Sequence, residues 1–289
     1  MQQSVHFIAR LLERSPCETS LRYHPTKLSI DDLEAVNTAI LGHALSSVLT
    51  PGTAYTVAID FTHDPYYGTV VPDNEGFIIR SRLEKSTNDF YSYVTVNAIT
   101  RDRRVTLTVY SVTEGASRVA FIAPCLDAIT ATGLKIQALC LDREFYTRKV
   151  IAFLKTVQVP FILPVRKHSR AMKHLPNVTR ARFGEYIMRG KPALHPAIAV
   201  TVLYAKGQRE KHGVENFGYV VNGVPRSPRR IHETYRSRFG IESSYRMLEA
   251  GQTQNLNLQS GDPLPLRHHL VPLKIGVIPP FIRNPGRFP

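Results

Sequence analysis

The sequence predicts an α/β fold built on a mixed sheet, in a chain of 289 residues. Two strand-like runs, 90–100 and 105–112, are joined by a short charged turn, as in an antiparallel hairpin. Helical and strand patterns then alternate between 116 and 165, which indicates parallel strands joined by helices. In addition, two apolar strand runs end in an aspartate, and the carboxyl ends of strands are where α/β sheets bind their ligands.

Composition and charge narrow the function. Apolar residues make up 43% of the chain and charged residues 21%, which is typical of a globular protein. The length suits roughly two domains of about 150 residues, or one large α/β domain with an insertion. Lysine and arginine number 37 against 23 acidic residues, so the formal net charge is +14. Such a basic chain favours nucleic acid as its partner, with an anionic membrane second.

Several protein classes are excluded by the spacing of residue types. The three cysteines, Cys17, Cys125 and Cys140, are widely separated and have no histidine at zinc-site spacing, which excludes a disulfide scaffold and a zinc module. The N-terminus has no basic-then-apolar signal segment, and no run of about 18 apolar residues occurs. We therefore expect no membrane partner and a cytoplasmic, nucleoid-associated protein.

Residues 1–52 are predicted to form a helical region. Ser29–Asp32 offers a capping oxygen and acidic residues, which stabilise a helix start. Apolar residues recur at helical spacing over 33–48, and Pro51-Gly52 ends the run. This helix either packs on the domain that follows or belongs to a DNA-contacting module.

Residues 53–165 are predicted to hold the centre of the sheet. β-branched and aromatic runs bounded by turn residues indicate strands, and Gly133 is placed to end a helix. The predicted strands are 55–60, 90–100, 105–112, 136–142 and 159–165. A loop is predicted at 63–68 and a turn at 101–104. Helices are predicted over 116–132 and from Asp142 to about 157.

The pattern changes after residue 165. Residues 166–225 read as a β-rich insertion with short strands at 186–188, 197–204 and 217–221. Ser227-Pro228 then begins a helix that ends at Gly251, because serine caps a helix and proline fits its first turn. Residues 252–289 contain seven of the chain's 20 prolines and are expected to form an irregular tail.

Positive charge gathers in two stretches. Residues 166–191 hold eight Lys and Arg against one acid, and residues 226–246 hold six Arg against two, so together they carry 11 of the +14 charges. A run of charge is commonly a solvated face. Because both runs flank candidate metal-binding carboxylates, we favour a phosphate-binding groove.

Two aspartates are candidate metal ligands. Asp60 follows the apolar run Val57-Ala-Ile, and Asp142 follows Leu139-Cys-Leu. Mg²⁺ prefers one or two carboxylates and leaves room for water and phosphate. Alternatively, Asp60 opens a turn and Asp142 caps a helix. The nearby His63-Asp64 pair is interpreted as turn chemistry.

The predicted helix after Ser227 carries one polar stripe. Its members lie within about 80° of one another at 100° per residue. Such a stripe either faces solvent or faces a cleft, and the apolar residues on both sides of it favour the cleft. The stripe consists of Tyr235, Arg238, Glu242, Arg246 and Glu249.

These residues together resemble a known family. Val57–Asp60, Leu139–Asp142 and Tyr235-x2-Arg-x3-Glu242 resemble the DDE transposases of bacterial and archaeal insertion sequences, in the group marked by a Tyr-x2-Arg-x3-Glu-x6-Lys signature. The resemblance spans about 30–250. It implies an RNase H-like catalytic domain over 53–251 with flanking helices and the β-rich insertion at 166–225.

The resemblance also implies a chemistry. Asp60, Asp142 and Glu242 would hold two Mg²⁺ (or Mn²⁺) ions, while Tyr235, Arg238 and Arg246 would contact DNA. The protein would cut double-stranded DNA at the terminal inverted repeats of its element and join the 3′-hydroxyl to target DNA. Pairing two DNA ends implies a homodimer in the DNA complex.

This sequence departs from the signature in two places. Position 249, the signature's lysine, is glutamate, and the Pro-rich tail 252–289 replaces the regular apolar structure that the family carries there. We interpret the tail as a frameshifted or decayed end. Two alternatives to an active transposase therefore stay open: a catalytically inactive, DNA-binding remnant, and an RNase H-like nuclease.

Overall fold

The computed structural model describes residues 39, 45, 48–70, 75–84, 86–100, 104–166, 181–190, 193–204 and 214–238. All but two of these residues lie in one compact unit, Val48–Ser243. Most of the predicted N-terminal helical region, the chain from 239 onward and the tail lie outside the described residues. The predicted domain boundaries therefore stay predictions.

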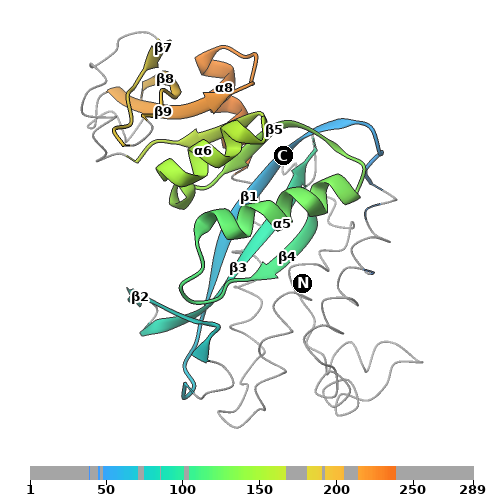
Figure 1. The fold of residues 1–289 in the computed structure, drawn as a ribbon, viewed down its shortest axis with the longest axis vertical. Helices are drawn as coiled ribbons and strands as arrows, with labels where there is room; N and C mark the ends of the chain where they lie inside the picture. The colour runs from blue at the N-terminus through green and yellow to red at the C-terminus, as the bar shows by residue number, and fades with distance from the viewer. Residues whose placement is uncertain are drawn as a thin grey trace, which may run out of the picture. The chain divides into compact units, whose positions relative to one another are not determined.

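The described strands form one mixed sheet (Figure 1). Its order is β2-β3-β1-β5-β6-β9-β8-β7, with β4 paired to β3 off this path. β1 runs parallel to β5, and β5 runs parallel to β6, whereas the other pairs are antiparallel. The strands are β1 Ala54–Pro65, β2 Ile78–Glu84, β3 Thr87–Ile99, β4 Arg104–Ser111, β5 Lys135–Leu141, β6 Phe161–Pro164, β7 Arg182–Glu185, β8 Ala197–Tyr204 and β9 Val214–Asn222.

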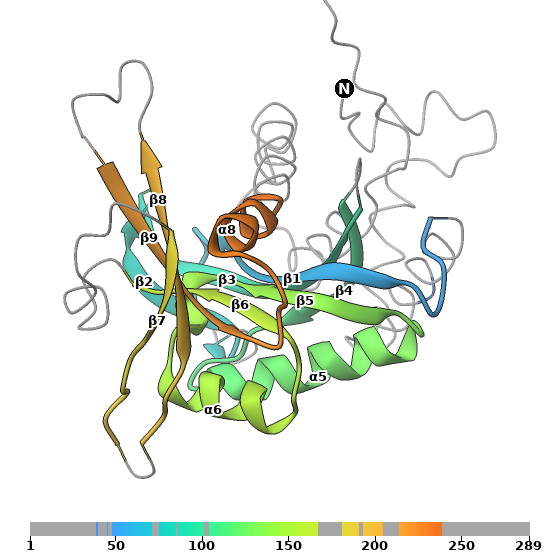
Figure 2. The same ribbon diagram turned by 90° about the horizontal axis from the view of Figure 1, so that it is seen from above.

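Helices cover both faces of this sheet (Figure 2). α5 (Arg118–Ala131) and α6 (Arg148–Thr156) lie on one face, and α8 (Pro228–Arg236) lies on the other. Each helix begins at a hydroxyl cap whose oxygen accepts a backbone N–H bond, as helix starts require. The arrangement confirms the predicted α/β class with a mixed sheet and is consistent with an RNase H-like fold.

β1 is longer than predicted. The expected strand stopped at Asp60, but β3 continues to pair with β1 as far as the Pro65↔Phe90 partners. His63, Asp64 and Pro65 are therefore strand residues, and their interpretation as a loop was wrong. The antiparallel partner, rather than local turn chemistry, decides where this strand ends.

The helix after Ser227 is shorter in the described chain than predicted. The cap at Ser227 and the proline in the first turn are confirmed, but α8 ends at Arg236 and is followed by a turn. The carbonyl oxygen of Ser237 accepts a hydrogen bond from Arg104 Nε at 2.9 Å. This hydrogen bond joins the residue that follows α8 to β4.

The predicted insertion extends the same sheet. β7, β8 and β9 form an antiparallel run, and β9 pairs with β6. The first of its strands lies at Arg182–Glu185, not at 186–188, where only an isolated bridge joins Met188 to Leu194. Within the described ranges, no helix has both the length and the apolar character needed to cross a membrane.

Candidate active site

Asp60 is placed by β1 at the centre of the sheet. The three residues before it, Val57, Ala58 and Ile59, are fully buried, and their β-branched and small side chains suit a strand covered on both faces. Asp60 pairs with Thr95 of β3 and is itself only 5% exposed. A carboxylate this deeply buried needs a charged or hydrogen-bonding partner.

Asp142 is the first residue after β5. The β1–β5 register ends at the Ile59↔Leu141 partners, so Asp60 and Asp142 follow directly on neighbouring parallel strands. The backbone N–H of Asp142 donates to the carbonyl of Ile59 at 3.3 Å. Although Asp142 occupies the cap position of a 3₁₀ turn, η2 (Arg143–Phe145), its side chain makes no capping hydrogen bond. Asp142 thus stands at a cap position, as one of the two interpretations expected, but its carboxylate does not make the capping bond.

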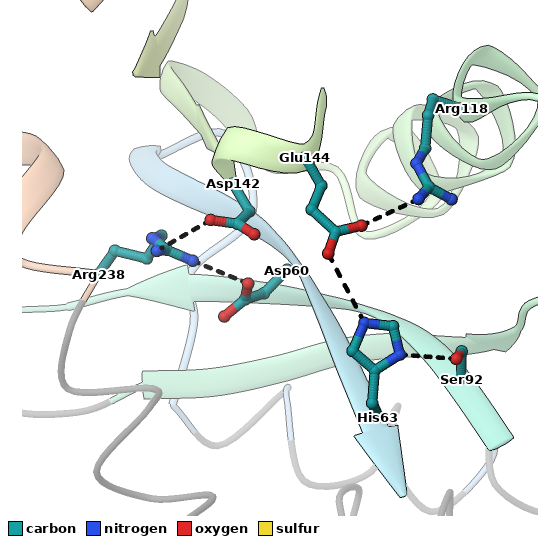
Figure 3. A network of polar contacts seen from close by, with 7 residues as sticks. All are labelled: Asp60, His63, Ser92, Arg118, Asp142, Glu144 and Arg238. Atoms are coloured by element: carbon teal, nitrogen blue, oxygen red, sulfur yellow. Dashed lines mark hydrogen bonds and ion pairs between the residues drawn. The ribbon is translucent and has the colours of Figure 1, made fainter. Parts of the chain in front are cut away.

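One guanidinium joins the two carboxylates. Arg238 donates from Nη1 to Asp60 Oδ1 at 2.8 Å and from Nη2 to Asp142 Oδ1 at 3.4 Å (Figure 3). Its side chain is 4% exposed, against 7% for Asp60 and 26% for Asp142. The planar fork of arginine suits two acceptors at once. The structure thus gathers two of the three predicted acidic residues around a single buried cation.

The two carboxylates meet in a largely buried place. Hard carboxylate oxygens close together are the ligand set that Mg²⁺ and similar ions prefer. The donors present therefore fit a divalent cation.

The third predicted ligand, Glu242, lies outside the described residues, as does Arg246. Within the part of the chain that the structure describes, no group of three His, Cys, Asp or Glu side chains could hold a metal ion. The Asp60–Asp142 pair is therefore a partial site, and the role of Glu242 stays a prediction.

The Tyr235 ring lies next to the Arg238 guanidinium. Its ring is 6% exposed and packs against Tyr219, with centroids 5.2 Å apart, while the Arg238 guanidinium carbon lies 5.1 Å from the Tyr235 centroid. Burial raises the pKa of the Tyr235 phenol above its ordinary range. The buried Tyr235 ring therefore packs against the Arg238 guanidinium. The predicted contact of Tyr235 with DNA stays a prediction.

A second polar group near the aspartates was missed by the sequence reasoning. Glu144 Oε2 accepts from Arg118 Nη2 at 2.9 Å, Glu144 Oε1 lies 3.7 Å from His63 Nε2, and His63 Nδ1 lies 2.7 Å from Ser92 Oγ (Figure 3). The close approach of His63 and the positive charges of Arg118 and Arg166 lower the pKa of Glu144, against the opposing effect of burial. The sequence offers one signal for this group: Glu144 lies close after Asp142 in the chain, and His63 lies close after Asp60.

A known protein family matches much of this chain. The family described as "Transposase DDE domain" matches residues 51–260. Among solved structures, the chain is similar to a piggyBac transposase in a synaptic complex with hairpin DNA, determined by cryo-EM. The identity is 10% and the TM-score 0.46, over 78% of this chain and 45% of that one. The chain thus spans less than half the length of that transposase.

No curated protein matches the chain. The family match covers well over half of the sequence and contains both Asp60 and Asp142. This chain therefore belongs to the DDE transposase domain family.

Proposed function

We propose that this protein is an insertion-sequence transposase that cuts double-stranded DNA at the ends of its element and joins the freed 3′-hydroxyl to target DNA. One observation carries the proposal. Asp60 and Asp142, which directly follow a shared register on neighbouring parallel strands, are gathered around one buried cation. The DDE family to which the chain belongs generally uses divalent metal ions.

Three side chains would hold two Mg²⁺ or Mn²⁺ ions: Asp60, Asp142 and Glu242. When bound, a pair of such ions activates an attacking oxygen and stabilises a leaving oxygen at phosphorus. The pairing of β1 with β3 fixes the main chain of Asp60, and the backbone N–H of Asp142 donates to the carbonyl of Ile59 just past the β1–β5 register. Glu242 would complete the set from the chain that follows α8.

Arg238 would have two successive roles. In the metal-free protein it neutralises part of the aspartate pair, since it contacts both carboxylates. If the carboxylates instead held divalent ions, its guanidinium would be available to donate to a phosphate of the DNA end. Arg246 and the basic stretches 166–191 and 226–246 would hold the remaining phosphates.

The test is DNA cleavage by the purified full chain with Mg²⁺ and duplexes that carry the element's ends. Asp60→Asn, Asp142→Asn and Glu242→Gln should each abolish nicking and leave DNA binding in place, because each removes one charged ligand. Asp89→Asn is the matched control, since Asp89 pairs with Arg80 on β2 and lies outside the site. Full nicking by any of the three variants would contradict the assignment.

The same assay separates the alternatives. The Pro-rich tail 252–289 favours an inactive remnant. Such a remnant would bind end DNA, but neither the wild type nor any variant would nick it. An RNase H-like nuclease would cut RNA–DNA hybrids in preference to duplex ends. If the DNA complex contains a homodimer, light scattering should give it the mass of two copies of the chain and two end duplexes.

A further inference from the structure

The side chains next to Asp60 leave β1 on opposite faces. Successive strand residues alternate between faces, so Phe61 and His63 lie on the face opposite to Asp60. Asp60 faces α8, through Arg238, whereas Phe61 contacts Phe121 of α5. The contacts of Phe61 thus form a second group on the face of the sheet that α5 covers, and Figure 2 shows α5 and α6 together on that face, opposite to α8.

Aromatic packing forms the first part of this second group. Phe145, the last residue of the turn after Asp142, stacks on Phe61 with centroids 4.8 Å apart. The Arg118 guanidinium carbon lies 4.5 Å from the Phe61 centroid. Phe145 is fully buried. The neighbour of one aspartate is therefore held directly by the turn that carries the other.

Ion pairing forms the second part. The same Arg118 guanidinium that covers Phe61 donates to Glu144, and Glu144 also faces His63. His63 is in turn bonded to Ser92, its cross-strand partner on β3. Glu144 therefore ties the turn after Asp142 to the end of β1 and to the first turn of α5.

We propose that Phe61, His63, Arg118, Glu144 and Phe145, here called the far-face clamp, are positioning residues that fix the separation of the Asp60 and Asp142 carboxylates for a divalent metal ion. The β1–β5 register ends at Leu141, so the clamp acts just where the strand pairing stops. Metal ligands must be held within about 0.5 Å of their working geometry, and residues that orient ligands typically change metal affinity 10- to 100-fold.

The clamp rests on the proposed metal-binding function, and its test keeps the two apart. The full-length protein is titrated with Mn²⁺ alone, without DNA, and free Mn²⁺ is followed by electron paramagnetic resonance. Glu144→Ala and Arg118→Ala should each weaken Mn²⁺ binding about tenfold. Glu144→Gln, which keeps an acceptor for Arg118, should lose less. The titration is run well below the melting temperature, so that a change in stability alone leaves the affinity unmoved.

Controls come from the exposed pair between β2 and β3. Arg80→Ala and Asp89→Ala also break an ion pair, at 3.2 Å, but should leave Mn²⁺ affinity at the wild-type value. Asp142→Asn should abolish binding. If Asp142→Asn abolishes binding while Glu144→Ala and Arg118→Ala bind as the wild type does, the clamp is wrong and the metal site stands. If Asp142→Asn binds Mn²⁺ normally, the metal site itself is wrong and the clamp falls with it.

Discussion

Replacing Arg238 with glutamine should destabilise the metal-free protein and make it more responsive to Mg²⁺. The pair between Arg238 and Asp60 is almost fully buried, with side chains 4% and 7% exposed and 2.8 Å between the charged atoms. Removing one member of such a pair leaves an uncompensated buried charge, which costs about 3 to 5 kcal/mol of unfolding free energy. The contact to Asp142 adds less, because that side chain is 26% exposed and the distance is 3.4 Å.

Mg²⁺ should recover much of this loss. Arg238 and a metal ion would compete for the same two carboxylates, so the variant should bind Mg²⁺ more tightly than the wild type. At a Mg²⁺ concentration about 100 times the Kd, ligand binding contributes about 2.7 kcal/mol to stability. Urea unfolding with and without Mg²⁺ measures both effects.

The matched control is Arg229→Gln on α8. Arg229 also forms an ion pair, with Glu233 at 3.2 Å, but its side chain is 82% exposed, so its unfolding curve should overlay the wild type. The reasoning is refuted if Arg238→Gln costs less than about 1 kcal/mol, or if Mg²⁺ stabilises the variant no more than it stabilises the wild type.

Three further predictions concern the surroundings of the site. Tyr219→Phe removes the hydroxyl that lies 2.7 Å from the buried His232 ring nitrogen, and should cost about 1 to 3 kcal/mol in thermal unfolding. The folded pKa of Glu144 lies below its ordinary value of 4.5, so its stabilisation is full above that pH and is lost as the pH falls through the folded pKa. The stability difference between wild type and Glu144→Gln should therefore shrink in acid, as the pH falls through the folded pKa of Glu144. Burial raises the pKa of the Cys125 and Cys140 thiols to about 12. A Cys17→Ser variant, which keeps only these two thiols, should therefore resist thiol reagents at pH 8 until it unfolds.

The sequence predicted the centre of the fold well because local signals and tertiary partners agree there. The run up to Ile59 and the run up to Leu141 are apolar, and they pair in parallel. The Ser227-Pro228 helix start is likewise a local feature, and it is confirmed. β2 was not predicted, because its sequence, Ile78–Glu84, alternates charge and apolar residues weakly and depends on β3 for pairing.

The site was predicted only as far as its acidic residues. Asp60 and Asp142 stand at the ends of readable strand runs, so their meeting follows from sheet topology. The position of Arg238 between them depends on where α8 packs, and the hydrogen bond from Arg104 to Ser237 beside it joins residues far apart in the sequence. Glu144 depends in the same way on contacts from α5 and β3, which no local pattern in the chain encodes.

Cleavage of the protein main chain by Fe²⁺ added to the proposed metal site tests the central claim most directly. Fe²⁺ with ascorbate and peroxide generates hydroxyl radicals at a divalent-metal site and cuts the neighbouring main chain, and mass spectrometry locates the cuts. If three acidic residues share the metal ions, cuts cluster near Asp60, Asp142 and Glu242, and excess Mg²⁺ suppresses all of them. Mg²⁺-sensitive cuts near the two aspartates without one near Glu242, or no Mg²⁺-sensitive cuts at all, would contradict the account.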